Sequence, residues 1–287
     1  MHIDAHFHCW QIARADYSWL TPERAPLYRD VSVADWQAQA APCGVTGGVL
    51  VQAAPTEAET HFLLQLADQN DVAQNTSITP ITPKVLGVVG WVDWLAPDAG
   101  QRVHQLARHT KLKGLRPMLQ DLADPAWVLQ PAVQPALQAM ADGGLVFDAL
   151  VRSAHLPHIL TLALRHPSLN IIIDHGAKPN IAAGEWQPWA DGIERIARET
   201  AAGCKLSGLF TEASPTAQGA DLQRWADHIL ACFGPARVLW GSDWPVLERS
   251  GKNYADWWQA TQHLLARFTT TERDAILGGN AARLYRL

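Results

Sequence analysis

Residues 145–176 read LVFDALVRSAHLPHILTLALRHPSLNIIIDHG. Two short apolar runs, Leu145–Val151 and Asn170–Gly176, flank a segment, His155–His166, in which apolar residues recur at three- and four-residue spacing. That spacing predicts an amphipathic helix, and the apolar runs on either side predict strands. Strands that are apolar almost throughout are typical of a parallel sheet covered on both faces. This stretch therefore predicts a strand–helix–strand unit with parallel strands.

The same unit repeats along the chain. Six further apolar runs predict strands: His2–His8, Gly47–Gln52, Val85–Asp93, Leu112–Leu119, Gly203–Leu209 and Arg237–Pro245. Helical spacing recurs between them, at Glu57–Gln74, Ala99–His109, Gln130–Ala141, Trp186–Thr200 and Leu222–Phe233. Eight units fit a closed α/β barrel of the (β/α)8 type, a TIM barrel, better than an open sheet, and no GxGxxG motif follows the first strand. We expect residues 1–287 to form a single domain, in which the loops Thr21–Pro26 and Ser77–Pro83 are insertions.

Composition excludes several classes of partner. Hydrophobic residues make up 48% of the 287 residues and charged residues 18%, which suits a globular protein with a large core. The net charge is −5 and no Lys/Arg-rich stretch occurs, so we expect no nucleic-acid partner. No apolar run approaches the roughly 20 residues that span a bilayer, so we expect no membrane partner. The four cysteines form no CxxC motif, and polar site residues begin at residue 2, which together predict a cytoplasmic protein with reduced thiols.

Polar side chains gather where the predicted strands end. In a parallel barrel these C-terminal ends form one face, which carries the active site. The residues concerned are His6, His8, Gln52, Trp91, Asp93, Arg116, Asp148, Arg152, His175, Lys178, Lys205, Ser207, Ser242 and Asp243. Structural alternatives remain open: Asp243 could cap the next segment, Arg116 could be an ordinary ion-pair partner, and Asp148 could hold Arg116 or a lysine in place. Their coincidence on successive strands predicts a functional site.

The first strand contains the run DAHFH at residues 4–8. Alternate residues of a strand face the same side, so Asp4, His6 and His8 are expected to point in one direction. Asp4 lies deeper and is interpreted as structural. The histidine pair could serve a metal site, a proton-transfer site or a hydrogen-bonded core network, because such groups are rarely buried without partners.

Several segments, taken in order along the chain, resemble the amidohydrolase superfamily: DAHFH, IDHGAKP, CKLSGL, GSDWPV and GGNAARLYRL. They resemble most its amidohydrolase 2 branch of lactone hydrolases, which includes L-fuconolactonase, L-rhamnonolactonase and the pyrone and muconolactone hydrolases. The segment LKGLRPMLQD at residues 112–121 is similar to the sugar-lactone members. The resemblance implies a barrel enzyme that opens a small-molecule sugar lactone. A metal-dependent decarboxylase, a pyrone- or muconolactone-type hydrolase and a catalytically inactive sugar-acid-binding barrel stay open as alternatives.

For a lactonase we expect Asp243 to act as general base on a water that is also held by His175 and by His6 or His8. Arg116, together with His6 or His8 in protonated form, is expected to stabilise the oxyanion. The resulting Asp243 carboxylic acid is expected to return its proton to the leaving ring oxygen. The residues expected to contact substrate hydroxyls are Trp91, Asp148, Lys178 and Lys205.

Metal-dependent members of the superfamily hold a bridging Lys or Glu at the end of strand four and a His on strand five. This chain has Arg116 and Asp148 there, so a two-metal site is not expected. One zinc or other divalent ion would still find enough ligands in His6, His8, His175 and Asp243. Because a fixed positive charge at Arg116 disfavours a cation, and relatives in this branch are thought to work without a metal, we expect no required cofactor.

Three loops are expected to shape the substrate pocket: Trp10–Arg29, Ala53–Glu59 and Thr211–Gly219. Tryptophans in YADWW (Tyr254–Trp258), taken as exposed, are a candidate contact for a homodimer.

Overall fold

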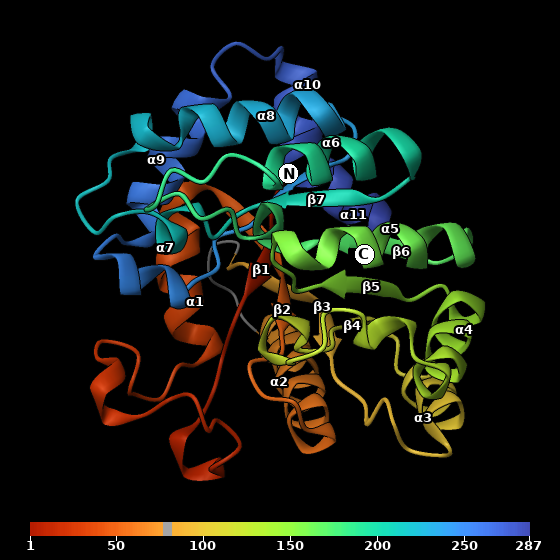
Figure 1. Ribbon diagram of the computed structural model, residues 1–287. Coiled ribbons are helices and arrows are strands. Elements are labelled where there is room, and N and C mark those ends of the chain that lie inside the picture. Colours follow the sequence, from red (N-terminus) through yellow and green to blue (C-terminus); the bar gives the residue numbers. More distant parts are fainter. Residues whose placement is uncertain (77–81) are drawn as a thin grey trace.

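The computed structural model describes residues 1–76 and 82–287, and within them eight parallel strands follow one another around a barrel (Figure 1). The strand order in the sheet is the order in the chain: β1 (His2–Phe7), β2 (Val45–Val51), β3 (Lys84–Gly90), β4 (Leu112–Leu115), β5 (Val146–Ala149), β6 (Asn170–Ile173), β7 (Gly203–Leu206) and β8 (Val238–Trp240). The predicted (β/α)8 class and all eight predicted strands are confirmed. The predicted loop Ser77–Pro83 falls largely on residues 77–81, which lie outside the described residues.

The ring closes between β1 and the segment that follows β8. Phe7 and Trp244 form a parallel bridge. The backbone N–H of His8 donates to the carbonyl of Trp244 at 2.8 Å, and that of Asp243 donates to the carbonyl of His6 at 2.8 Å. Barrel closure therefore places Asp243 beside the two histidines of the first strand.

Helices cover the outside of the barrel. The predicted helices are confirmed as α2 (Glu57–Thr76), α3 (Ala99–Leu106), α4 (Gln134–Gly143), α5 (Leu156–Arg165), α6 (Trp189–Glu199) and α8 (Gln223–Phe233). The apolar spacing does not reveal the others, which are α1 (Val33–Ala40), α7 (Leu209–Glu212), α9 (Tyr254–Leu264), α10 (Thr270–Asp274) and α11 (Asn280–Leu284). In the described part of the chain, none of the helices is long and apolar enough to cross a membrane.

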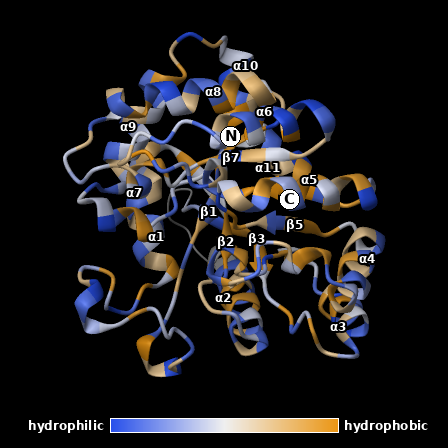
Figure 2. Cartoon of the chain, viewed as in Figure 1, coloured by the Kyte–Doolittle hydropathy of each residue, from blue (hydrophilic) through white to orange (hydrophobic). Residues whose placement is uncertain are grey.

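Apolar side chains pack in two regions. The interior of the barrel holds small and β-branched residues of the strands together with Tyr285 from the C-terminal segment. A larger cluster fills the space between strands and helices, and Figure 2 shows hydrophobic residues concentrated on the strands at the centre, with hydrophilic residues on the outer turns. The four cysteines, which lie in described segments, are free.

The prediction of exposed tryptophans in Tyr254–Trp258 is wrong. Tyr254 and Trp257 are 0% and 1% exposed. The ring of Trp258 packs against that of Trp240, with centroids 5.0 Å apart. These aromatic rings belong to the helix–barrel core, because α9 turns its apolar face inward, and the homodimer stays a prediction without this support.

Candidate active site

The side chains predicted to do the chemistry come together at the C-terminal ends of the strands. His6 lies in β1 and His8 just beyond it, while Arg116, His175 and Asp243 follow β4, β6 and β8. All five are buried, none more than 3% exposed. Their convergence follows from the parallel topology, which gathers the C-terminal ends of all strands at one face.

Asp243 lies among three imidazoles. Its Oδ1 is 3.4 Å from Nε2 of His8, and 3.8 Å from Nε2 of both His6 and His175. Burial alone would raise the pKa of Asp243, but the neighbouring imidazoles, that of His175 first, hold the pKa well below its usual value. The carboxylate is therefore ionised at neutral pH and able to accept a proton.

Asp243 and His175 both have backbone conformations that non-glycine residues rarely adopt. Their φ angles are 56° and 52°, in the left-handed region. Such conformations cost on the order of 1–3 kcal/mol and persist only where the surrounding structure imposes them. The Asp243–His6 backbone hydrogen bond imposes it on one, and Ser207, whose Oγ lies 2.8 Å from Nδ1 of His175, helps to hold the other.

The protonation state of His175 and the neutral tautomer of His8 follow from their surroundings. Burial lowers the pKa of His175 to about 4, so this ring is neutral at neutral pH. Nδ1 of His8 is 2.7 Å from the carbonyl oxygen of Val51, which can only accept, so Nδ1 carries a proton and Nε2 is the acceptor in the neutral ring. Nε2 of His8 and the carboxylate of Asp243 face each other across 3.4 Å, and with His8 neutral both can accept from one water.

Arg116 forms the cationic side of the cluster. Its Nη1 is 3.3 Å from Oδ2 of Asp174 and 3.4 Å from Nε2 of His6, and its Nη2 donates to the carbonyl of Gln52. Nε of Arg116 and Oε1 of Gln52 are buried without a hydrogen-bond partner. Because buried polar atoms are seldom left unpaired, a water or a polar ligand would be needed to satisfy these two atoms.

A buried ion cluster lies behind His6. Nζ of Lys205 is 2.5 Å from Oδ2 of Asp148, 2.9 Å from Oδ1 of Asp174 and 3.0 Å from Nδ1 of His6. Tyr285 donates to the other oxygen of Asp148 at 2.6 Å. Burial raises the pKa of Asp148 to about 6, whereas Lys205 and His6 hold the pKa of Asp174 well below its usual value against the effect of burial.

This cluster includes two of the residues predicted to contact substrate. The side chains of Lys205 and Asp148 are 0% exposed, and their polar atoms face each other, Asp174, Tyr285 and His6. The geometry therefore does not support contact with substrate hydroxyls. It supports the open alternative that Asp148 holds a lysine in place.

The other two predicted substrate contacts lie at the rim. Lys178 follows β6, and its Nζ is 3.5 Å from Oε1 of Glu212, whose other oxygen is 3.5 Å from Arg152. Trp91 directly follows β3 and is half-buried. Both side chains keep access to solvent, and their contact with substrate stays a prediction.

The alternation predicted that Asp4 shares a face with His6 and His8, and this prediction is wrong. The carboxylate of Asp4 accepts hydrogen bonds from Trp36 of α1 at 3.1 Å and Tyr254 of α9 at 3.0 Å, both outside the barrel, and from Ser242. A register irregularity between Asp4 and Phe7 breaks the two-residue alternation. Asp4 therefore ties β1 to the neighbouring helices and to β8, which agrees with its interpretation as structural.

Asp174 and Tyr285 are missed by the sequence reasoning. Asp174 stands next to His175 in IDHGAKP, and an acidic residue at the end of the apolar run NIII is a signal of its own. Tyr285 gives no such signal, because its contact with Asp148 spans 137 positions. Glu59, also missed, accepts from the backbone N–H groups of Ala53 and Ala54 and shapes the loop after β2.

The donor atoms fit one divalent ion. Among the described residues, two overlapping clusters could hold a metal: His6, His8 and Asp243, and His6, Asp174 and His175. In the first, Nε2 of His6 and His8 are 3.2 Å apart, and each lies 3.4–3.8 Å from Oδ1 of Asp243. Ligands about 2.0–2.1 Å from a tetrahedral zinc are themselves roughly 3.4 Å apart, so these spacings are compatible with zinc.

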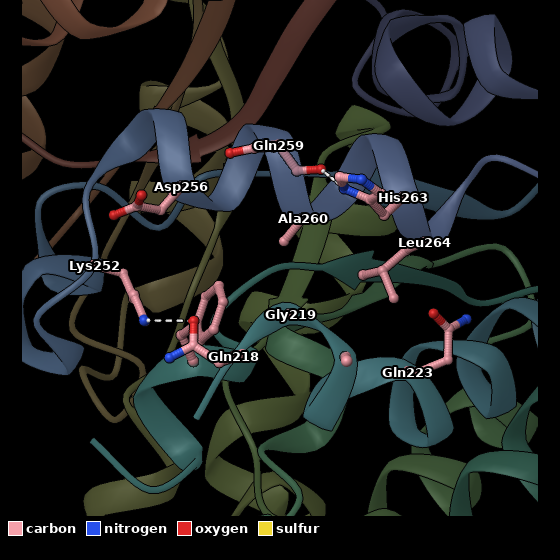
Figure 3. Close-up of a pocket in the computed structure, with 11 residues that line it drawn as sticks. Gln218, Gly219, Gln223, Lys252, Asp256, Gln259, Ala260, His263 and Leu264 are labelled. Atoms are coloured by element: carbon pink, nitrogen blue, oxygen red, sulfur yellow. Dashed lines mark hydrogen bonds between the residues drawn. The ribbon is translucent and has the colours of Figure 1, made fainter. Parts of the chain in front are cut away.

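A separate cavity lies away from this cluster. It has a volume of about 380 Å³ and lies between α9 and the segment 218–223, as Figure 3 shows. Lys252 donates to Gln218 across its edge at 3.4 Å. None of the clustered histidines and carboxylates lines this cavity, so the candidate active site is the cluster at the strand ends.

The chain belongs to the amidohydrolase family, whose sequence model matches residues 3–287. It is 41% identical to L-fucono-1,5-lactonase of Burkholderia ambifaria over 99% of this chain and 95% of that protein. It is 32% identical to L-fucono-1,5-lactonase of Burkholderia multivorans over 100% of this chain and 96% of that protein. A crystal structure of an amidohydrolase from Burkholderia multivorans with bound Zn superposes with a TM-score of 0.90 at 32% identity, covering 100% of this chain and 99% of that one. The predicted family is confirmed.

Proposed function

We propose that this protein hydrolyses a sugar lactone of the aldonolactone type, with L-fucono-1,5-lactone as the first candidate substrate. The observation that carries the proposal is the placement of Asp243 within 3.4–3.8 Å of three imidazoles at the strand ends, beside Arg116. The 41% identity to L-fucono-1,5-lactonase of Burkholderia ambifaria supports the substrate class. A cytoplasmic location is part of the proposal, supported by the free thiols.

The first step is attack by water. Asp243 accepts one proton of the water, and the bare Nε2 of His8 accepts a hydrogen bond from the other, which holds the oxygen for attack on the lactone carbonyl. His175, whose Nε2 lies 3.8 Å from Oδ1 of Asp243, borders the same water. The new carbon–oxygen bond converts the carbonyl into a tetrahedral oxyanion.

Arg116 stabilises the oxyanion, and the protonated Asp243 supplies the proton for the leaving group. Arg116 carries a fixed positive charge and N–H donors, and loss of such a donor typically costs about 2.7–4 kcal/mol of barrier. When the bond between the carbonyl carbon and the ring oxygen breaks, the protonated Asp243 returns its proton to that oxygen. Water has then been added across the ester bond, and Asp243 is again ionised.

A neutral polyhydroxylated ring suits the unpaired polar atoms of this site. A sugar hydroxyl both donates and accepts, so it can satisfy the acceptor Oε1 of Gln52 and the donor Nε of Arg116. Lys178 and Trp91 at the rim are the proposed contacts for the more distant hydroxyls.

A divalent ion, when bound, would be held by His6, His8 and Asp243 with His175 beside them. It would supply Lewis-acid polarisation of the carbonyl and a more acidic water. We propose that it is not required, because the guanidinium of Arg116 lies 3.4 Å from Nε2 of His6 and already supplies positive charge there.

The proposal is tested with a pH-indicator assay across aldonolactones, using purified protein with and without chelator. We expect acid release from L-fucono-1,5-lactone far above the spontaneous rate, little changed by the chelator. Loss of activity on chelation with recovery on zinc addition would overturn the metal-free proposal. Absence of lactone hydrolysis, together with bound metal and CO2 release from carboxylated substrates, would favour the decarboxylase alternative.

A further inference from the structure

We propose that Lys205 is a positioning residue that fixes the tautomer of His6, so that His6 presents an N–H at Nε2 beside Arg116. The proposal deepens the proposed lactonase function and rests on it, because the pair of N–H groups would bind the oxyanion of an opening lactone. The buried ion cluster around Lys205 would then take part in the reaction by orienting His6, in addition to stabilising the fold.

The first line of argument is the chemistry of Lys205. An ammonium group has three N–H donors and no acceptor. Nζ of Lys205 is 3.0 Å from Nδ1 of His6, so that nitrogen accepts. A neutral imidazole that accepts at Nδ1 carries its proton on Nε2.

Asp174 is the competitor for the same nitrogen. Its Oδ1 lies 3.5 Å from Nδ1 of His6 and, as an acceptor, would favour a proton on Nδ1. The same oxygen lies closer to the ammonium of Lys205, at 2.9 Å, and the ammonium lies closer to His6 than the carboxylate does. The shorter contacts therefore favour Lys205 as the partner of His6.

The second line of argument comes from the other side of the ring. Nε2 of His6 and Nε2 of His8 are 3.2 Å apart. His8 donates through Nδ1 to the carbonyl of Val51, so the neutral form of His8 has a bare Nε2. Two facing nitrogens form a hydrogen bond only when one carries a proton, and here that nitrogen is Nε2 of His6. With His8 neutral, its contacts thus lead to the same tautomer of His6 as the contact with Lys205.

The consequence is a pair of donors on one side of Asp243. Nη1 of Arg116 lies 3.4 Å from Nε2 of His6 and, as a donor, would favour a bare Nε2, but the contact of Lys205 with Nδ1 is shorter, at 3.0 Å. With its proton on Nε2, His6 presents a donor that can share one acceptor atom with Arg116. A lactone oxygen would replace His8 as the acceptor of the His6 proton when negative charge develops on it. Donors held in place before the reaction, in a site shielded from water, are the most effective oxyanion stabilisers.

The experiment reads the tautomer directly. Two-dimensional 1H–15N NMR on protein with 15N-labelled histidine distinguishes a protonated from a bare ring nitrogen, and loss of one signal set in His6→Gln assigns His6. In the unliganded wild type we expect a proton on Nε2 and none on Nδ1 of His6. A proton on Nδ1 would overturn the proposal without any variant of Lys205.

The variant Lys205→Met removes the donor at similar side-chain length. We expect the His6 proton to move to Nδ1, toward Asp174, and kcat for lactone hydrolysis to fall about 100-fold with KM within a few-fold, the loss expected for one oxyanion donor. Because Lys205→Met leaves the buried Asp148 without its cation and Asp174 with Arg116 alone, Lys205→Met/Asp148→Asn is made in parallel to keep the charge balanced. An unchanged tautomer in whichever variant folds would overturn the proposal.

Lys113→Met is the matched control. Lys113 is also a strand lysine, in β4, but its Nζ contacts the carbonyl of Arg286 and lies apart from the histidines. We expect this variant to keep both the tautomer and kcat. If wild-type protein hydrolyses no lactone, the proposed function fails while the NMR result on His6 still stands; if it hydrolyses lactone but His6 is protonated at Nδ1, only the inference fails.

Discussion

At the scale of single residues, the place of a site residue could be predicted from the sequence when the residue follows the end of a strand. It could not be predicted for two residues that lie inside a strand. Arg116, His175 and Asp243 all follow the last residue of a strand, and the sequence places them correctly at the face of the barrel. Asp148 and Lys205 lie inside β5 and β7, one layer below. The predicted strands extend several residues too far at their C-terminal ends, so they do not reveal this depth, and the predicted contact of both residues with substrate finds no support in their burial.

The buried neutral imidazole of His175 predicts a pH-dependent stability. Its pKa in the folded protein is about 4, against about 6.5 when unfolded, so between these values only the unfolded chain binds the proton. Its contribution is present above pH 6.5 and is lost as the pH falls toward 4. We expect the wild type to lose about 3 kcal/mol of unfolding free energy relative to His175→Gln between pH 7 and pH 4.

Urea unfolding at a series of pH values measures this difference. His61→Gln, which replaces an exposed histidine of α2, is the matched control and is expected to show no such trend. A difference between wild type and His175→Gln that does not vary with pH would mean that His175 is not held neutral in the folded protein.

At the scale of elements, local irregularities place the site residues, and these are the features that periodic patterns miss. The bulge in β1 turns Asp4 outward and His6 inward, although both sit at alternate positions. Helix α9 begins at the capping pair Asn253 and Asp256, a signal that the sequence does contain. The helix is not predicted, because its tryptophans are expected to be exposed, whereas Trp257 belongs to its buried apolar face. Alternation therefore predicts the strand and not the side chain directions within it.

The turn after β7 places Gly208 against the ring of His175. Gly208 has a φ of 64°, and a Cβ atom there would lie 2.8 Å from ring atoms of His175. We expect Gly208→Ala to destabilise the protein by about 1–2 kcal/mol through backbone strain and to lower kcat as well, because the new methyl displaces the ring.

Gly184→Ala separates the two effects. Gly184 has a φ of 68°, and a Cβ atom added there would meet nothing within 4 Å, so this position carries the strain without the collision. Thermal unfolding and lactonase assays on both variants should show similar losses of stability and a loss of kcat in Gly208→Ala alone. Full activity in Gly208→Ala would mean that the position of His175 does not limit the reaction.

At the scale of the whole molecule, closure of the barrel joins residues that are distant in the chain. The fold class is predictable because the strand–helix unit repeats eight times, and any parallel barrel brings the strand ends together. The contact of Tyr285 with Asp148 could not be predicted from the sequence. Nothing in the residues around Tyr285 indicates that this side chain enters the barrel interior. Tyr285 of the C-terminal segment thus fills the barrel interior beneath the active site, an interaction called the seal below.

Tyr285→Phe tests this seal. It removes the hydroxyl that donates to Asp148 at 2.6 Å and leaves a buried carboxylate oxygen with one partner fewer. We expect a loss of about 1–3 kcal/mol in unfolding free energy, seen as a lower Tm. Tyr28→Phe, at a position 41% exposed, should leave Tm within experimental error. Equal Tm values for the two variants would show that the hydroxyl contributes nothing to the seal.

The most direct measurement of the central claim is the rate of acid release from L-fucono-1,5-lactone by wild type and Asp243→Asn at equal concentration. Asparagine keeps the shape of the side chain but cannot accept the proton, so we expect kcat to fall about 10²–10⁴-fold while circular dichroism and Tm show an intact fold. Asp142→Asn, an exposed position at the end of α4, should retain full activity. A folded Asp243→Asn with wild-type kcat would contradict the account, because the carboxylate among the three imidazoles would then not be the base.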